Sequence, residues 1–113
     1  MAFDNSLADR VADSLTSKGV FFVEKKMFGG LCFMVDDKMC VGVLGDKLMA
    51  RVGPNAYDAA LKNEFAEEMA FTGKPMAGYV FVNPEGIISD VRLDHWVQLC
   101  INFNPLAKSS KKN

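Results

Sequence analysis

The chain has 113 residues, a length typical of one domain and too short for a catalytic domain together with a separate cofactor domain. Half of the residues are hydrophobic and 24% are charged, which excludes a fibrous or intrinsically disordered chain. Thirteen basic against fourteen acidic side chains leave a net charge of −1, so no overall electrostatic field attracts the protein to polyanions.

The first predicted element is an amphipathic helix that begins after Ser6 and ends at Gly19. Apolar residues recur at helical spacing from Leu7 to Leu15, and charged residues fall on the opposite side. Ser6 and Asp9 resemble a capping box, because each side chain can accept a hydrogen bond from the other's backbone amide. Gly19 suits the left-handed conformation that ends many helices.

Four strands are predicted next, at 20–28, 31–35, 39–44 and 48–52, because Val, Phe and Met are frequent there. The short breaks between them are Gly29-Gly30, Asp36-Asp37 and Gly45-Asp46, and their brevity implies antiparallel neighbours rather than crossover connections. In the last strand Leu48 and Ala50 alternate with Met49 and Arg51, which predicts one core face and one wetter face. A meander with one exposed face follows from this pattern.

The second half of the chain predicts a short helix, two strands and a final helix. Pro54 favours the first position of a helix that runs to Lys62. Strands are predicted near 69–72 and 79–82, separated by the break 73–75, and residues 83–86 match a type I turn. Ser89 can cap a helix whose apolar stripe runs from Leu93 to Phe103.

The order α-ββββ-α-ββ-α groups strands instead of alternating them with helices. This order predicts a two-layer α+β fold, with an antiparallel sheet of about five to six strands and the helices packed on one face. Residues 1–105 are expected to form a single domain and residues 106–113 a flexible basic tail. No apolar run approaches the length of about 18 residues needed to span a membrane, and no secretory signal is seen. We therefore expect a cytoplasmic protein without membrane contact.

Several segments carry a family resemblance: KMFGGLCF at 26–33, DKM at 37–39, LMARV at 48–52, FTGKPM at 71–76 and GY at 78–79. Together they resemble the N-terminal domain of TfoX/Sxy-type competence regulators. The resemblance implies a small bacterial α+β domain, a link to DNA uptake and transcriptional co-activation, and no known catalytic activity. Regulators of this type carry a second, helical domain, whereas this sequence reaches only a basic tail after Phe103, so we expect a stand-alone domain.

The family motif nominates an interaction surface. Its candidate residues are Lys26, Met27, Phe28, Gly29, Gly30, Arg51 and Lys74. The glycines could let backbone amides approach a phosphate or carboxylate, with the lysines supplying charge. The competing interpretation, which we favour, is that the glycines serve a tight turn or a bulge. No helix opens after them, so neither the P-loop nor the dinucleotide fingerprint is satisfied.

Catalytic and metal-binding residues are few. His95 is the only histidine, and we expect it on the flank of the final helix rather than as a general base. Cys32, Cys40 and Cys100 have no Cys-x-x-Cys spacing, which predicts buried thiols in a reducing compartment rather than disulfides or zinc ligands. The seven methionines are interpreted as adaptable core filler, with a Met-lined partner groove as the alternative. No cofactor, metal or enzymatic activity is expected.

The basic tail contributes Lys108, Lys111 and Lys112. Without these lysines, ten basic residues face fourteen acidic ones, a net charge of −4, which argues against nucleic-acid binding by the folded body. The sequence therefore predicts a non-enzymatic regulatory or adaptor module that binds a protein partner and exists as a monomer or weak homodimer. Anion binding at Gly29 and Gly30 is the alternative, and weak nucleic-acid binding through the tail lysines is a third hypothesis.

Overall fold

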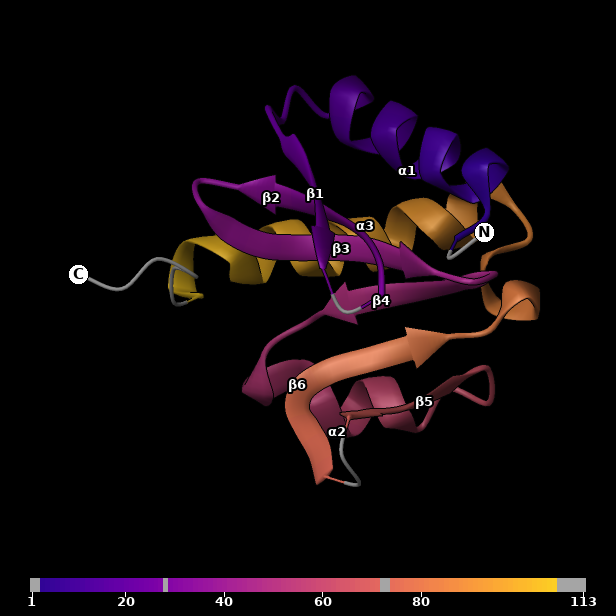
Figure 1. Cartoon of the computed structure of the whole chain (residues 1–113). Helices are drawn as coiled ribbons and strands as arrows, with labels where there is room; N and C mark the ends of the chain where they lie inside the picture. The colour runs from indigo at the N-terminus through magenta and orange to yellow at the C-terminus, as the bar shows by residue number, and fades with distance from the viewer. Residues whose placement is uncertain (1–2, 28, 72–73, 108–113) are drawn as a thin grey trace.

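The structure is a computed structural model and describes residues 3–27, 29–71 and 74–107. Three α-helices and six strands follow the predicted order (Figure 1). The elements are α1 (Asn5–Ser17), β1 (Val23–Met27), β2 (Gly30–Val35), β3 (Lys38–Leu44), β4 (Lys47–Arg51), α2 (Pro54–Leu61), β5 (Ala66–Phe71), β6 (Lys74–Val82), η1 (Pro84–Ile87), α3 (Asp90–Phe103) and η2 (Asn104–Leu106). The predicted α+β fold is confirmed.

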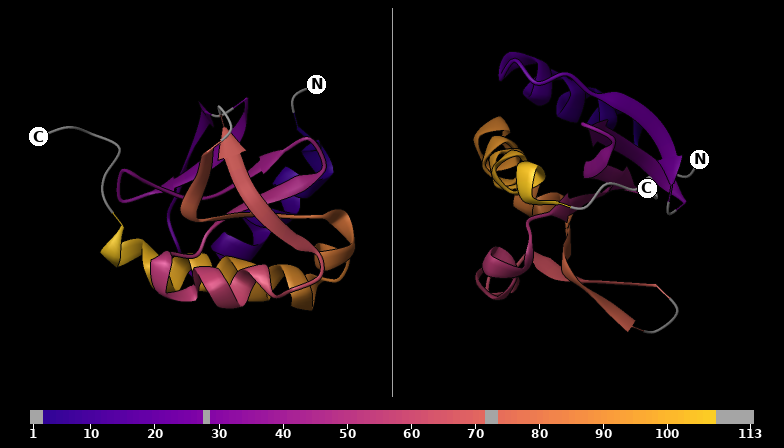
Figure 2. Two further views of the ribbon diagram at one scale, coloured as in Figure 1. Left: turned by 90° about the horizontal axis from the view of Figure 1, so that it is seen from below. Right: turned by 90° about the vertical axis from the view of Figure 1, so that its left-hand side faces the viewer.

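The six strands form one antiparallel sheet in the order β1-β2-β3-β4-β6-β5. The first four strands are a meander, since short turns leave each strand beside its predecessor. After β4 the chain passes through α2 to the outer strand β5, and β6 then returns between β5 and β4. The three helices lie on one face of the sheet and the strands form the other layer, as the right-hand view of Figure 2 shows. The predicted two-layer arrangement is therefore confirmed.

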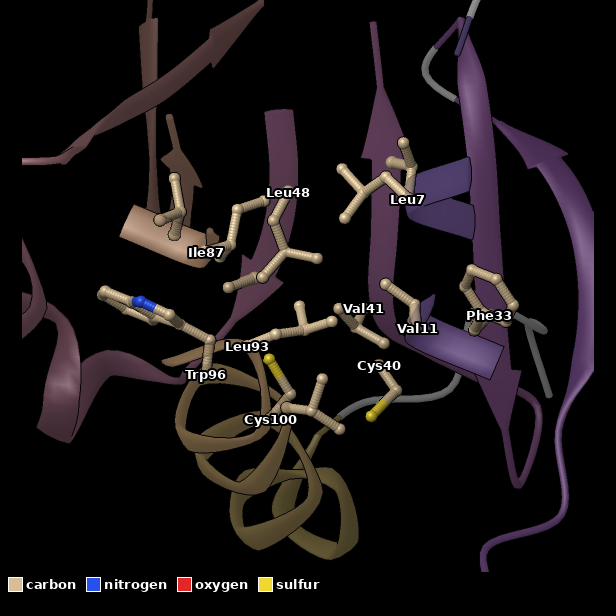
Figure 3. Packing of buried hydrophobic residues seen from close by; sticks show 14 of the residues in the cluster. Leu7, Val11, Phe33, Cys40, Val41, Leu48, Ile87, Leu93, Trp96 and Cys100 are labelled. Carbon is tan, nitrogen blue, oxygen red and sulfur yellow. The ribbon is translucent and has the colours of Figure 1, made fainter. Parts of the chain in front are cut away.

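The helix-covered face holds the larger hydrophobic core. Inward side chains of α1 and α3 meet alternate residues of β2, β3, β4 and β6, and Figure 3 shows the centre of this packing. Phe33 is fully buried, and the ring of Phe22 contacts it edge to face at 5.2 Å between centroids. Cys40 and Val41 both pack into this core because the β2–β3 register shifts between Phe33 and Met34, as at a β-bulge.

The helix-free face holds a second cluster, so the predicted wetter face of β4 is wrong at its centre. Met49 is fully buried there. The buried members are Cys32, Met34, Met39, Met49 and Met69, with Met27, Leu44, Met76, Tyr79 and Phe81 packed against them. Six of the seven methionines thus lie in one cluster. Unbranched thioether chains fill irregular space well, and the bent outer strands cover the middle of this face.

Strand β6 bends where it leaves β4 (Figure 1). At the bend the carbonyl of Gly78 accepts hydrogen bonds from the amides of Val52 (2.9 Å) and Gly53 (3.0 Å). Gly78 has a φ of +89°, and a Cβ there would lie 3.2 Å from the backbone of Gly53. Beyond this point β6 pairs with β5 alone, as a hairpin that reaches past the end of β4.

Three predicted boundaries are corrected by the structure. Asp4, not Ser6, caps α1, because its carboxylate accepts hydrogen bonds from the amides of Ser6 (2.8 Å) and Leu7 (3.3 Å). The first strand begins at Val23 rather than at residue 20. The predicted break at 73–75 is partly strand, because Pro75 lies where β6 has no neighbour but β5, a position at which a missing amide is tolerated.

Polar contacts join the helices to each other and to the sheet. Arg10 of α1 bonds to the carbonyl of Ile87 (2.8 Å) and pairs with Asp90 (3.3 Å). Buried Asn104 donates to the carbonyl of Val35 at 3.2 Å, which fixes the end of α3 against the β2–β3 hairpin. In the described part of the chain, no helix is long and apolar enough to cross a membrane.

Candidate functional site

Strand β1 is the outermost strand on one side of the sheet and carries the most exposed surface. Val23, Glu24, Lys25 and Lys26 are all exposed, and only Met27 is partly buried. Within the residues that the structure describes, β1 pairs only with β2. Its other edge therefore presents backbone N–H and C=O groups without a strand partner, which is a template for pairing with another chain.

Two large apolar side chains lie beside this edge. Phe21 is 94% exposed and Val23 is 70% exposed. Both line a hollow of about 450 Å³ to which Met34 also contributes. Exposed apolar side chains that cluster next to an open strand edge are typical of protein contact surfaces.

The register of the β1–β2 pair assigns the side chains of β1 to the two faces. Val23 lies opposite Met34 and Lys25 opposite Cys32, and these β2 residues belong to the methionine-rich cluster. Glu24 and Lys26 therefore alternate to the helix-covered side. The edge thus carries one acidic and one basic side chain on one face, and mainly apolar side chains with one lysine on the other.

The helix-free face adds a partly exposed apolar surface between two cationic side chains, one at each end of β4. Lys47 lies 5.5 Å from the ring centroid of Phe81 and pairs with Glu67 at 2.9 Å. At the other end of β4, the Arg51 guanidinium lies 5.2 Å from the ring centroid of Tyr79. These contacts are cation–π geometry, so the charged groups flank the methionine cluster rather than form a pocket for a small anion.

The glycines of the family motif lie in a tight hairpin. Met27 pairs with Gly30, and Gly29, which directly precedes β2, has a φ of +78°. A Cβ on Gly30 would lie 2.1 Å from the carbonyl oxygen of Val43. Both glycines therefore have a structural role here: Gly29 supplies positive φ and Gly30 permits close approach of β3. Phe28 lies outside the described residues.

The other predicted site residues do not gather around this turn. The Gly30 end of β2 lies against Val43 and Leu44, and Leu44 pairs with Lys47 at the start of β4. Arg51 lies at the opposite end of β4, about 13 Å away along the strand at ~3.3 Å per residue. The backbone of Lys74 pairs with Phe71 in the distal part of the β5–β6 hairpin. The tail lysines Lys108, Lys111 and Lys112 lie outside the described residues.

The three cysteines are buried. Burial raises the pKa of Cys32 to about 11 and that of Cys40 to about 12, with the nearby Arg51 charge opposing the latter shift. Burial, and then the neighbouring Cys40, raise the pKa of Cys100 well above its ordinary value. These groups are thiols at neutral pH, and a protonated, buried thiol is a poor nucleophile.

The raised pKa of Cys32 predicts a pH-dependent contribution to stability. Below pH 9 the thiol is protonated in both the folded and the unfolded chain, whereas up to about pH 11 only the unfolded chain ionises. The contribution of the Cys32 thiol to the free energy of unfolding therefore falls as pH rises, by about 1.4 kcal/mol per pH unit. Urea unfolding should show the stability gap between the wild type and Cys32→Ala narrowing from pH 9 to 11. Met34→Ala is the control: it removes no titratable group, so its stability difference from the wild type should stay constant over this pH range. A constant difference for Cys32→Ala as well would contradict the raised pKa of this thiol.

His95 lies on the exposed side of α3, 6.0 Å from the ring of its neighbour Trp96. Among residues 3–27, 29–71 and 74–107, no group of three or more His, Cys, Asp or Glu side chains is placed to hold a metal ion. The described residues thus give His95 a flanking position, as the helical spacing predicted.

Sequence reasoning missed Phe21, Val23 and Glu24 as surface residues. A run of Val and Phe before Glu-Lys-Lys indicates the start of a buried strand. Only the sheet order shows that this strand is at the edge. The run of three charged residues at 24–26 was the available signal, because charged residues mark many edge strands.

Comparison with known proteins matches residues 15–104 to the family model of the TfoX N-terminal domain. No curated protein and no solved structure matches the chain. The matched range begins in α1 and ends in η2, so it includes the whole sheet and both faces described above.

Proposed function

We propose, because this chain belongs to the TfoX N-terminal domain family, that it is a regulatory or adaptor module without catalytic activity, which acts through protein–protein contacts. The observation that carries the proposal is the β1 edge. This strand leaves its outer backbone groups unpaired among the described residues, next to Phe21 and Val23, which are 94% and 70% exposed. Burial of such groups against a partner strand combines backbone hydrogen bonds with apolar contact.

The chemistry of the described residues supports a non-catalytic role. A nucleophilic enzyme needs an activated side chain near a base, and here Cys32 and Cys40 have pKa values raised to about 11 and 12. His95 is exposed, and the centroid of its ring lies 6.0 Å from that of its chain neighbour Trp96. Neither residue type is therefore arranged as an acid–base or nucleophilic site.

The physiological role we propose follows the family resemblance. The module would act in the cytoplasm, where a reducing environment suits three buried free thiols, and would take part in competence or transcription regulation through its bound partner. The negative net charge of the chain without the tail lysines argues against phosphate contacts as the main mode of binding by the folded body.

In-cell photo-crosslinking tests the contact surface. A photoreactive benzoyl-phenylalanine in place of Phe21 is expected to give discrete protein adducts, because this side chain lies beside the open edge. The matched control carries the same group in place of Lys62, which is exposed at the end of α2. Adducts of equal yield and pattern from both positions would contradict a specific contact at β1.

A further inference from the structure

We infer that the strand bound at the β1 edge belongs to a second copy of this chain, with Lys25 facing Lys25 of the other copy across a two-fold axis. This inference rests on the proposed function, because it takes β1 as the contact surface and adds the partner and the register. The resulting pair joins two six-stranded sheets into one continuous antiparallel sheet.

The pleat of the strand restricts how β1 can pair with itself. In an antiparallel pair, residues directly opposite each other point to the same face, and side chains alternate along each strand. Two identical strands related by a two-fold axis normal to the sheet therefore place one residue opposite its own copy. Within β1 the central choices for this residue are Glu24, Lys25 and Lys26.

Charge selects among these registers. With Lys25 on the axis, Glu24 of each copy faces Lys26 of the other, which gives two opposite-charge pairs on the helix-covered side. With Glu24 on the axis, two carboxylates face each other, and with Lys26 on the axis, two ammonium groups do so. Opposite charges directly across a strand pair stabilise it, and like charges destabilise it. The register centred on Lys25 is the one that pairs Glu24 with a lysine, at the cost of one Lys25–Lys25 contact.

The apolar side chains also fit this register. Val23 faces Met27 of the other copy on the helix-free side, and Phe21 reaches the level of its Gly29. Gly29 is exposed and has no side chain to obstruct an aromatic ring, while Phe21 is 94% exposed in the single chain. The axis is normal to the sheet, so the two helix-free faces lie on the same side of the dimer.

The opposite edge of the sheet is a poorer partner for β1. Strand β5 carries a register shift between Glu68 and Ala70, and an irregular edge resists further pairing. Both carboxylate oxygens of Glu67 are already bonded, to Lys47 at 2.9 Å and to Asn83 at 3.2 Å. Pairing of β1 with β5 would also leave open edges and build a filament, whereas pairing of β1 with β1 closes as a dimer.

The test is sedimentation equilibrium of the full chain at low salt with charge-exchange variants. Glu24→Lys and Lys26→Glu should each weaken self-association about tenfold, because each turns two attractive pairs into repulsive ones. The double variant, Glu24→Lys with Lys26→Glu, should restore it. Lys25→Ala should tighten it about fivefold by removing the like-charge contact on the axis. Lys62→Glu is the control, because it changes the same charge on the exposed end of α2.

Each outcome decides the inference. The inference is supported if self-association is weaker in both single variants, is restored in the double variant and is tighter in Lys25→Ala. A wild type that is monomeric at about 1 mM, a range in which even weak complexes form, overturns it, as does a dimer that none of these substitutions changes. If the chain is monomeric but position 21 still gives discrete adducts with another protein, the inference fails and the proposed function stands. If the chain is monomeric and position 21 gives no discrete adducts, both the inference and the proposed function fail.

Discussion

Gly30→Ala is expected to lower the free energy of unfolding by about 3 kcal/mol, more than a surface substitution of the same size. The added Cβ would lie 2.1 Å from the carbonyl oxygen of Val43 and 3.1 Å from the Cα of Leu44. Both neighbours are backbone atoms of β3, so no side-chain rotation can relieve the clash. The strand pair must separate locally, and interstrand hydrogen bonds are lost.

Gly45→Ala is the matched control for this substitution. Gly45 lies between β3 and β4 and has a φ of +59°, but a Cβ there meets nothing within 4 Å. Its expected cost is about 1 kcal/mol, from the left-handed conformation alone. Urea unfolding of both variants separates the two effects. A Gly30→Ala cost no larger than that of Gly45→Ala would show that the second glycine of the family motif is not required for close strand packing.

Met49→Ala is expected to destabilise the protein by about 3 kcal/mol, as for other fully buried methionines. Met49 projects from the central strand β4 into the methionine cluster of the helix-free face and is fully buried. Its removal leaves a cavity in a cluster that also includes Cys32 of β2 and Met69 of β5, from strands on either side of β4. The helix-free face thus contributes to stability as a second core and not as a solvated surface.

Met76→Ala provides the comparison within the same cluster, because Met76 is only partly buried. We expect a cost of about 1 kcal/mol, since less apolar surface is lost. Thermal unfolding followed by circular dichroism measures both variants. Equal costs for Met49 and Met76 would contradict a buried second cluster, and a cost of Met49→Ala below about 1 kcal/mol would mean that this face is open at its centre.

Local sequence patterns predicted much of the fold. The 3.6-residue period of α3 and its cap at Ser89 are confirmed, with the Ser89 hydroxyl accepting a hydrogen bond from the amide of Arg92 at 3.2 Å. The Asp36-Asp37 break is a turn in which both residues have positive φ, as short hairpins require. These features depend on residues close together in the chain, and that is why they could be predicted.

Features set by distant contacts were not predictable. The insertion of β6 between β4 and β5 depends on how the chain passes through α2, and no local pattern encodes it. The alternation around Met49, between Lys47-Leu48 and Ala50-Arg51, predicts a wetter face. Its burial comes instead from a cluster whose members are distant in the chain, such as Met69, twenty positions along. The alternation of side chains along β4 predicted which residues share a face of the sheet, but not what covers that face.

The candidate site was predictable only in part. The family motif directed attention to residues 26–30, and Lys26 and Met27 do belong to the edge strand β1. Arg51 and Lys74 were grouped with them by sequence similarity, yet Arg51 lies at the far end of β4 and the backbone of Lys74 in the β5–β6 hairpin. Whether a strand is at an edge is a property of the whole sheet, and this is why Phe21 and Val23 emerged only from the structure.

The most direct test of self-association through β1 is an isotope-filtered NMR experiment on a mixture of labelled and unlabelled chains at about 1 mM. The two-fold register gives intermolecular contacts between Glu24 of one copy and Lys26 of the other, and between Val23 and Met27. Contacts in this pattern are the expected result. Intermolecular contacts that involve the helices while β1 shows none, or a complete absence of intermolecular contacts, would contradict self-association through β1.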